Sequence, residues 1–311
     1  MARYRSTGRL RTRHHRVREG PEALPVTDRV LVTGGRGFVG RRLVQLLRER
    51  GVEVHAPDRG VLDVAAGAFP DVTVDWVIHL AGRTFVPASW SEPADFYRIN
   101  VLGTVNVLDY CRKTQARLIH VSGYCYGIPE TLPIPETAPL KPNNPYAFSK
   151  KAAEDACRFF FECLQVSVMI VRPFNIYGPG QPVNFLIPHI VEQAIDSSAA
   201  IVVEDDTPRR DYVHLDDVVG AIDCIRRNPR PGAVFNIGSG KSYSVAQVAE
   251  IVRSAANVGK PFVSRGNRRV NDIPDVIADI AAIRDATGWS PSITLEDGLR
   301  GLVAHAKGRG A

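Results

Sequence analysis

Residues 29–40 read RVLVTGGRGFVG, and this stretch decides the fold. The run RVLVT predicts a buried strand, and residues 38–51, FVGRRLVQLLRERG, predict an amphipathic helix. The turn between them carries the glycines of a G-x-G-x-x-G or G-x-x-G-x-x-G pattern, at Gly34, Gly35, Gly37 and Gly40. Glycines at such a turn let the backbone approach a pyrophosphate, and the N-terminus of the helix attracts the anion.

Apolar segments and longer amphipathic segments alternate along the chain after residue 28. Strands are expected in VEVHAPD, DWVIHLAG, RLIHVS and VSVMIVRP, and helices at about 95–113 and 146–164. This alternation predicts an α/β fold, a doubly wound parallel (Rossmann) sheet with a second, smaller α/β substrate-binding lobe. We expect the dinucleotide-binding domain to comprise residues 25–175 with 211–240, and the smaller lobe residues 176–210 with 241–311.

An acidic residue at the end of the second expected strand indicates which dinucleotide binds. Asp58 follows Gly40 by eighteen residues, where a carboxylate can accept bonds from the adenosine ribose, so NAD is favoured over NADP. Arg59 weakens this preference because an arginine can accommodate a 2′-phosphate. Asp63 is expected at the adenine edge or in a turn. Further cofactor contacts are expected from Phe38, Val39, Leu80, Ala81 and Gly82.

Three residues far apart in the sequence form one candidate proton-transfer device. Tyr146 and Lys150, in PYAFSK, are four residues apart on an expected helix and therefore share a face. The lysine ammonium is expected to favour the phenolate and so to lower the pKa of Tyr146. Ser122 follows the strand RLIHV, at the sheet edge where ligands of such folds bind. Its hydroxyl can hold a substrate oxygen while the tyrosine moves the proton.

The composition separates a basic N-terminal segment from a nearly neutral remainder. Residues 1–27 hold seven arginines and two glutamates, whereas the rest carries 32 basic and 31 acidic residues. We expect residues 1–24 to be a disordered arginine-rich tail. An RNA-binding arm, a transit-like segment and an overlong start are all open for this tail. Nucleic-acid binding is not expected as the function, because arginines without interleaved aromatic residues support only weak, salt-sensitive attraction.

Membrane, disulfide and metal classes are not favoured by the sequence. No run approaches eighteen apolar residues, and the N-terminus lacks the apolar centre of a signal peptide. The five cysteines form no CxxC pair and leave one over, so neither a disulfide framework nor a metal site is expected. We therefore expect a soluble, cytoplasmic protein with no membrane partner.

From about residue 28 to 303 the chain resembles the extended short-chain dehydrogenase/reductases, the NAD-dependent epimerase/dehydratase family of sugar nucleotides. The motifs that carry the resemblance are VLVTGGRGFVG, DWVIHLAG, NVLGT, HVSGYCYG, PYAFSK, RPFNIYGPGQ, RRDYVHLDDV, FNIGSG and TGWSPSITLEDGL. The resemblance implies that Ser122, Tyr146 and Lys150 are catalytic, with Lys150 also touching the nicotinamide ribose. It puts Asn100 and His79 on cofactor-side motifs, although His79 can equally be a packed strand-end residue.

The resemblance also implies a substrate and an assembly. Family members hold the nucleoside diphosphate with groups that match Asn175, Arg210 and Arg269 here, and arginine forks suit phosphates. Whether Arg209 or Arg210 turns inward is open, as is a salt bridge of Arg210 to Asp211 or Asp216. Family members often dimerise through the helices that match 95–113 and 146–164. The apolar ACRFFFECL of the second helix agrees with a homodimer.

The residues that follow Ser122 help to distinguish among the reactions that members of this family catalyse. Its 4,6-dehydratases carry an Asp-Glu pair directly after the catalytic Ser or Thr, whereas Gly123 and Tyr124 stand here, so dehydration is disfavoured. We favour a UDP-hexose 4-epimerase, and the small Val276 leaves N-acetylated sugars open. The close alternative is an NAD(P)H-dependent reductase of an NDP-4-keto-6-deoxyhexose. An alternative of another class is a non-catalytic NAD-binding regulator.

Overall fold

Six parallel strands form the central sheet in the computed structural model, which describes residues 28–268 and 272–309. They are β1 (Arg29–Thr33), β2 (Glu53–His55), β3 (Trp76–His79), β4 (Arg117–Val121), β5 (Val168–Pro173) and β9 (Val234–Ile237). Their order is β2-β1-β3-β4-β5-β9, and every neighbouring pair is parallel. The chain therefore reverses its progress across the sheet at β1, between β2 and β3. Such a reversal opens a crevice at the carboxyl ends of the strands.

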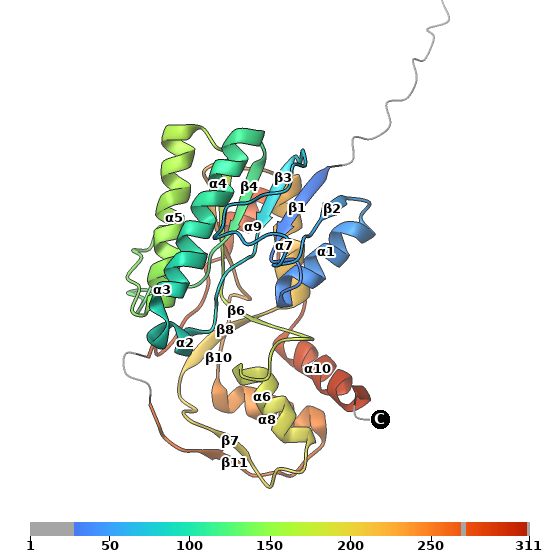
Figure 1. The fold of residues 1–311 in the computed structure, drawn as a ribbon. Helices are drawn as coiled ribbons and strands as arrows, with labels where there is room; N and C mark the ends of the chain where they lie inside the picture. The colour runs from blue at the N-terminus through green and yellow to red at the C-terminus, as the bar shows by residue number, and fades with distance from the viewer. Residues whose placement is uncertain (1–27, 269–271, 310–311) are drawn as a thin grey trace, which may run out of the picture.

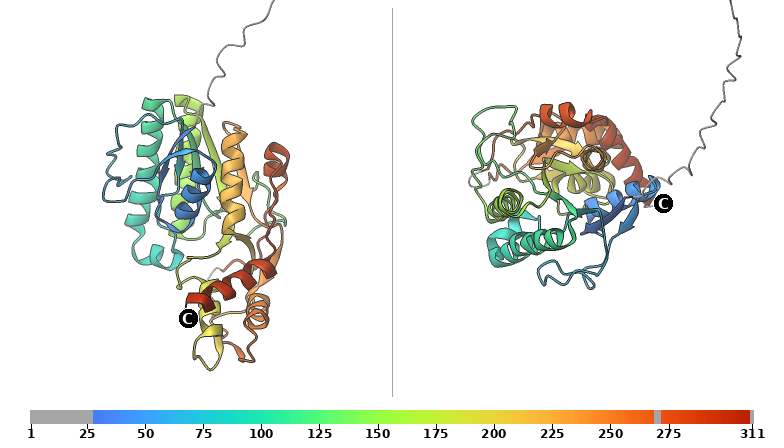
Figure 2. Two further views of the ribbon diagram at one scale, coloured as in Figure 1. Left: turned by 90° about the vertical axis from the view of Figure 1, so that its right-hand side faces the viewer. Right: turned by 90° about the horizontal axis from the view of Figure 1, so that it is seen from above.

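Helices cover both faces of this sheet (Figures 1 and 2). One face packs under α1 (Phe38–Glu49), α7 (Leu215–Arg227) and α9 (Ala281–Thr287), and the other under α4 (Gly103–Thr114) and α5 (Pro145–Leu164). The side chains of each strand alternate between the two cores, as Ile119 and Leu118 of β4 do. Because both faces are buried, the strands read as nearly continuous apolar runs. The predicted doubly wound α/β fold is confirmed.

A smaller lobe lies at the carboxyl ends of the large sheet (Figure 1). It contains β6 (Asn175–Tyr177), β7 (Ile201–Val203), β8 (Arg209–His214), β10 (Ser242–Ser244) and β11 (Phe262–Ser264), with α6 (Leu186–Ile195), α8 (Val245–Ala256) and α10 (Leu295–Arg309). Strand β8 pairs with β6 and β10, so residues 211–214 belong to the smaller sheet, unlike the expected boundary at 211. The buried Asp211 joins the lobes, since its carboxylate accepts bonds from the backbone nitrogens of Ser239 (2.6 Å) and Ala278 (3.0 Å).

The helix expected at 95–113 is divided in the structure. After α2 (Val86–Ser91) come α3 (Pro93–Phe96), a π-helical stretch η1 (Tyr97–Leu102), and only then α4. π-Helical turns occur often at functional sites. Here the stretch carries Asn100, a predicted cofactor residue. The 3.6-residue period of apolar residues did not predict a π-helical turn at this place.

Candidate active site

The glycine-rich turn between β1 and α1 packs against the segment that follows β3. Gly34 has a φ of +72°, a left-handed conformation that favours glycine. A Cβ atom on Gly34 would lie 2.7 Å from the backbone nitrogen of Ala81, so a larger residue does not fit. The structure thus brings the predicted loop beside Leu80 and Gly82 at the crevice. This bare backbone at the N-terminus of α1 fits the pyrophosphate of a dinucleotide.

An arginine pairs with the predicted ribose carboxylate. Arg36, from the glycine loop, forms an ion pair with Asp58. Arg36 also lines a surface pocket together with Arg41, Arg48 and Ala56. A carboxylate here can bind ribose hydroxyls, whereas arginines beside it can hold a 2′-phosphate. The charges around the expected adenosine ribose therefore suit NADP as well as NAD. The sequence did not predict that Arg36 pairs with Asp58.

The remaining residues predicted near the cofactor lie around this loop. Phe38 and Val39 are partly buried against the core beneath α1. Arg59 is exposed. The carboxylate of Asp63 accepts a bond from the backbone nitrogen of Ala65 at 3.0 Å, which is a turn contact.

Asn100 links the segment after β3 to the start of α5. It is buried, its side-chain oxygen accepts a bond from the backbone nitrogen of Arg83 (2.8 Å), and its amide donates to Ser149 Oγ (2.9 Å). A Cβ atom on Gly82 would lie 3.0 Å from Asn100 Oδ1 and 3.5 Å from Lys150 Nζ. Asn100, Gly82 and Lys150 therefore gather in one place, as the motifs predicted.

Helix α5 presents Tyr146 and Lys150 to the carboxyl end of β4. The N-terminus of the helix is capped: Pro145 occupies its first turn, and Asn144 Oδ1 accepts a bond from the nitrogen of Ala147 at 2.8 Å. The buried Lys150 Nζ donates to the backbone oxygen of Val121 at 2.9 Å.

The third residue of the trio lies beside this contact. The Tyr146 hydroxyl lies against the backbone of Gly123, so a Cβ atom there would overlap it. Ser122, between Val121 and Gly123, is buried, and its Oγ has no hydrogen-bond partner among the described residues. The three predicted residues therefore surround one point, with a free hydroxyl available to a substrate oxygen.

The protonation of this cluster differs from the expectation in one respect. Burial raises the pKa of Tyr146, whereas the sequence argument expected Lys150 to lower it. The loss of hydration at the buried phenol is the main cause, and the neighbouring Cys125 raises the pKa of Tyr146 further. Burial also lowers the pKa of Lys150 to about 8.

His79 has a structural set of contacts. Its ring nitrogens lie 2.7 Å from Thr33 Oγ1 and 3.1 Å from Thr104 Oγ1, so it ties β3 to β1 and α4. Burial lowers its pKa to about 3. The neighbouring His120 of β4 is also buried, and neither of its ring nitrogens has a hydrogen-bond partner among the described residues.

Two of the three predicted diphosphate ligands are described. Asn175 begins β6, beside Tyr212 of β8. Arg210 donates to the oxygen of Ile273 (2.6 Å) and to Asp272 Oδ1 (2.7 Å). Its salt-bridge partner is thus Asp272, and not Asp211 or Asp216 as the sequence suggested. The third predicted ligand, Arg269, lies outside the described residues, as does the tail at 1–24.

The two arginines of β8 contact different parts of the molecule. Arg209 turns away, towards the oxygen of Ser242 at 2.6 Å. Arg210 lies near Tyr124, whose pKa its charge lowers, although burial raises that pKa more. The Tyr124 hydroxyl donates to the oxygen of Gly127 at 2.6 Å. An aromatic ring and a glycine thus stand where a dehydratase carries its acid and base.

Sequence reasoning also missed a buried ion pair. Arg172 of β5 and Glu154 of α5 are 1% and 0% exposed, and Arg172 Nη2 lies 2.6 Å from Glu154 Oε2. The only available signal was the arginine of RPFNIYGPGQ together with a glutamate one turn after Lys150.

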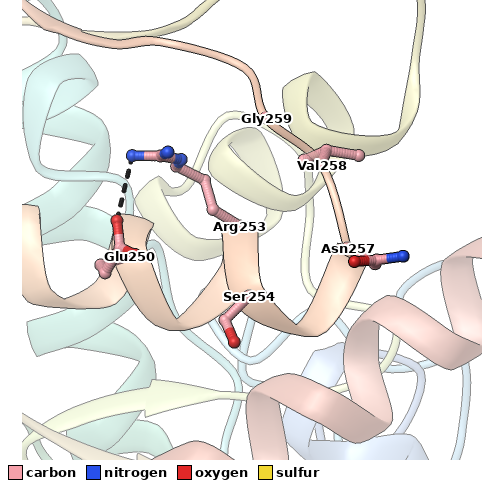
Figure 3. Close-up of a pocket in the computed structure, with 6 residues that line it drawn as sticks. All are labelled: Glu250, Arg253, Ser254, Asn257, Val258 and Gly259. Atoms are coloured by element: carbon pink, nitrogen blue, oxygen red, sulfur yellow. Dashed lines mark hydrogen bonds and ion pairs between the residues drawn. The ribbon is translucent and has the colours of Figure 1, made fainter.

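A second surface depression lies far from these residues. It is at the end of α8 in the smaller lobe and is lined by Glu250, Arg253, Ser254, Asn257, Val258 and Gly259 (Figure 3). Arg253 pairs with Glu250 at 3.0 Å, and neither is close to the dinucleotide loop. No group of three potential metal ligands gathers among the described residues. No helix in that part of the chain is long and apolar enough to cross a membrane.

The fold and the dinucleotide loop define a nicotinamide-dependent enzyme. The chain belongs to the NAD dependent epimerase/dehydratase family, whose model matches residues 30–238. It is 33% identical over 301 residues to GDP-6-deoxy-D-mannose reductase of Pseudomonas aeruginosa, covering 91% of this chain and 99% of that one. The predicted family is confirmed.

Solved structures agree over nearly the whole chain. RMD from Pseudomonas aeruginosa, complexed with NADPH, has a TM-score of 0.84 at 32% identity, covering 91% of this chain and 100% of that one. UDP-glucose 4-epimerase of Thermotoga maritima, with UDP-glucose, has a TM-score of 0.84 at 26% identity and the same coverage. The family uses nicotinamide dinucleotides, so the predicted cofactor class is confirmed at the level of NAD or NADP.

Proposed function

We propose that this protein is an NADPH-dependent reductase of a nucleoside-diphosphate 4-keto-6-deoxyhexose. The observation that carries the choice is the ion pair of Arg36 with Asp58, which neutralises the carboxylate that would otherwise repel a 2′-phosphate. The full-length similarity to a GDP-6-deoxyhexose reductase supports the same reaction, and a GDP-linked substrate in particular. The reductase is thus preferred to the UDP-hexose 4-epimerase that the motifs favoured.

The reduction requires one hydride at the sugar C4 and one proton at the oxygen bound to C4. Bound NADPH supplies the hydride to the carbonyl carbon. Tyr146 gives its phenolic proton to the carbonyl oxygen, and Ser122 donates a hydrogen bond to that oxygen. The Lys150 ammonium stabilises the phenolate that remains. Asn175 and Arg210 are proposed to hold the diphosphate, and Arg210 exchanges its contact with Asp272 for a phosphate oxygen.

Elimination of water is not part of the proposal. It needs an acid and a base beside the sugar, and the two positions after Ser122 provide neither. A side chain at Gly123 would overlap the Tyr146 hydroxyl. The hydroxyl of Tyr124 is engaged with Gly127, and burial raises its pKa.

A 4-epimerase is the second candidate, and Asp58 is the observation that favours it. If Arg36 turned to solvent, the carboxylate would bind the ribose hydroxyls of a tightly held NAD. The nicotinamide released from acid-denatured protein separates the two candidates. Protein that is empty as purified and binds NADPH more tightly than NADH supports the reductase. About one NAD per chain would contradict it and favour the epimerase.

We also propose a cytoplasmic homodimer built on η1 and α5. Tyr97, Leu102, Phe148 and Phe159 are 38–56% exposed there. Of the three successive phenylalanines, only Phe160 packs against the core, and Phe159 and Phe161 are exposed. Light scattering at micromolar concentration tests this. A dimer that becomes monomeric in Phe159→Lys but not in Val263→Lys, on the smaller lobe, is expected. Monomeric native protein would contradict it.

A further inference from the structure

A buried carboxylate lies one helical turn after Lys150. Glu154 is four residues further along α5, on the same face, and is fully buried. Arg172 of β5 binds both of its oxygens, with Nε 3.0 Å from Oε1 and Nη2 2.6 Å from Oε2. Glu154 is therefore bound to an arginine of the sheet and lies one helical turn from the lysine of its own helix.

The ion pair is fixed by a chain of buried polar groups. Arg172 Nη1 donates to the Tyr126 hydroxyl (2.8 Å), which donates to Asn236 Oδ1 (2.6 Å). The Cys125 thiol lies 3.7 Å from Glu154 Oε1. Cys125 and Tyr126 belong to the loop that begins at Ser122. The same contacts thus hold the ion pair in place and anchor the loop that carries the candidate hydroxyl.

The other groups that face Lys150 are uncharged near neutral pH. They are His79 of β3, His120 of β4, Cys125 of the following loop, and Tyr146 and Cys157 of α5. Burial lowers the pKa of both histidines and raises the pKa of both thiols and of the phenol. Among the described residues, Glu154 is then the nearest negative charge to Lys150. Glu154 is itself paired with Arg172 and with the half-exposed Arg158, whose Nη2 lies 3.5 Å from Glu154 Oε2.

We propose that the Glu154–Arg172 ion pair sets the charge on Lys150, with Glu154 favouring the ammonium form and Arg172 limiting that effect. The two residues act through Lys150 and are positioning residues for the proton transfer at Tyr146. Burial lowers the pKa of Lys150, and the Glu154 charge opposes that shift. The functional meaning rests on the proposed reaction, whereas the electrostatic relationship stands without it.

The test measures the titration of Lys150 directly, in the absence of substrate. Protein with ¹⁵N-labelled lysine is titrated by NMR, and the Lys150 Nζ signal is assigned by its loss in Lys150→Met. Glu154→Gln is expected to lower the midpoint by about one pH unit. Arg172→Gln is expected to raise it by about one unit, because Lys150 is then the main buried cation beside Glu154. Tyr126→Phe breaks the same chain without removing a charge and is the matched control, with an unchanged midpoint.

A merely structural role of the ion pair would not move the Lys150 midpoint in opposite directions in Glu154→Gln and Arg172→Gln. Removing one half of a buried ion pair leaves an unpaired buried charge, which can destabilise the fold. The double variant Glu154→Gln with Arg172→Gln avoids this because it removes both charges. Its Lys150 titration midpoint is expected between those of the two single variants. Arg158→Gln, at the surface, is expected to raise the midpoint slightly. Shifts in one direction, or none in any of these variants, would overturn the proposal. Absence of reductase activity would contradict the proposed function and leave this titration unaffected.

Discussion

The hydroxyl of Tyr146 lies against the backbone of Gly123, with no room for a Cβ atom between them. This contact puts the candidate proton donor directly beside Ser122. It also explains why the position after the serine carries no acid here, since any side chain would push the phenol out of place. A shift of about 1 Å at a reacting group can cost about a hundredfold in rate.

Gly123→Ala is therefore expected to lower kcat/KM about a hundredfold, with little change in the affinity for NADPH. Steady-state kinetics and fluorescence titration of NADPH measure the two effects. Gly220→Ala is the matched control, because a Cβ there would meet only Trp289 Nε1, at 3.9 Å. Full activity of Gly123→Ala would show that Tyr146 is not held as described.

The rate of reduction is expected to fall as the pH rises above about 8. Burial lowers the pKa of Lys150 to about 8, and the charged form, which stabilises the phenolate, is lost above that pH. A pH profile of kcat between pH 6 and 10 measures this. A profile that stays level to pH 10 would count against Lys150 as the charged partner of Tyr146.

The free energy of unfolding is expected to decrease in mild acid. The unfolded chain protonates His79 and His120 below about pH 6.5, whereas folded His79 stays neutral down to about pH 3. Stability present above pH 6.5 is thus lost as the pH falls, by about 1.4 kcal/mol per pH unit for each histidine. Urea unfolding at pH 7, 6 and 5 measures the slope. His120→Phe should make it shallower, while the exposed His305→Gln should not; equal slopes would refute this.

Cofactor preference is expected to follow the Arg36–Asp58 pair. Arg36→Gln should weaken NADPH binding about tenfold relative to NADH, and Asp58→Asn should shift the preference towards NADPH by a similar factor. Isothermal titration of both cofactors measures each ratio. Arg300→Gln, on α10 of the smaller lobe and away from this pocket, is the comparison variant. If neither ratio moves, the 2′-phosphate is bound elsewhere.

The central sheet and the proximity of the three candidate residues were predictable because their signals are local. Strand β4 is a largely apolar run that ends directly before Ser122, and the spacing of Tyr146 and Lys150 needs only a helix. The relative position of the two segments follows from the rule that parallel strands end at one edge.

Contacts that depend on three-dimensional packing were not predictable. The π-helical turn around Asn100 and the Arg210–Asp272 pair involve residues that no sequence period brings together. The direction of the Tyr146 pKa shift was predicted wrongly for the same reason, because the complete burial of the phenol raises this pKa. The spacing of residues in the sequence indicates which side chains lie close together, but not how much water reaches them.

The most direct test of the proposed reaction follows one hydride. Protein is incubated with a GDP-4-keto-6-deoxyhexose and NADPH that carries deuterium at the transferred position of the nicotinamide, and the product is analysed by mass spectrometry and NMR. We predict one deuterium at the sugar C4 for each NADPH oxidised, with the rate reduced by a factor of about 10² to 10⁴ in Tyr146→Phe. Unchanged NADPH, together with interconversion of UDP-hexose 4-epimers by protein-bound NAD, would contradict the account.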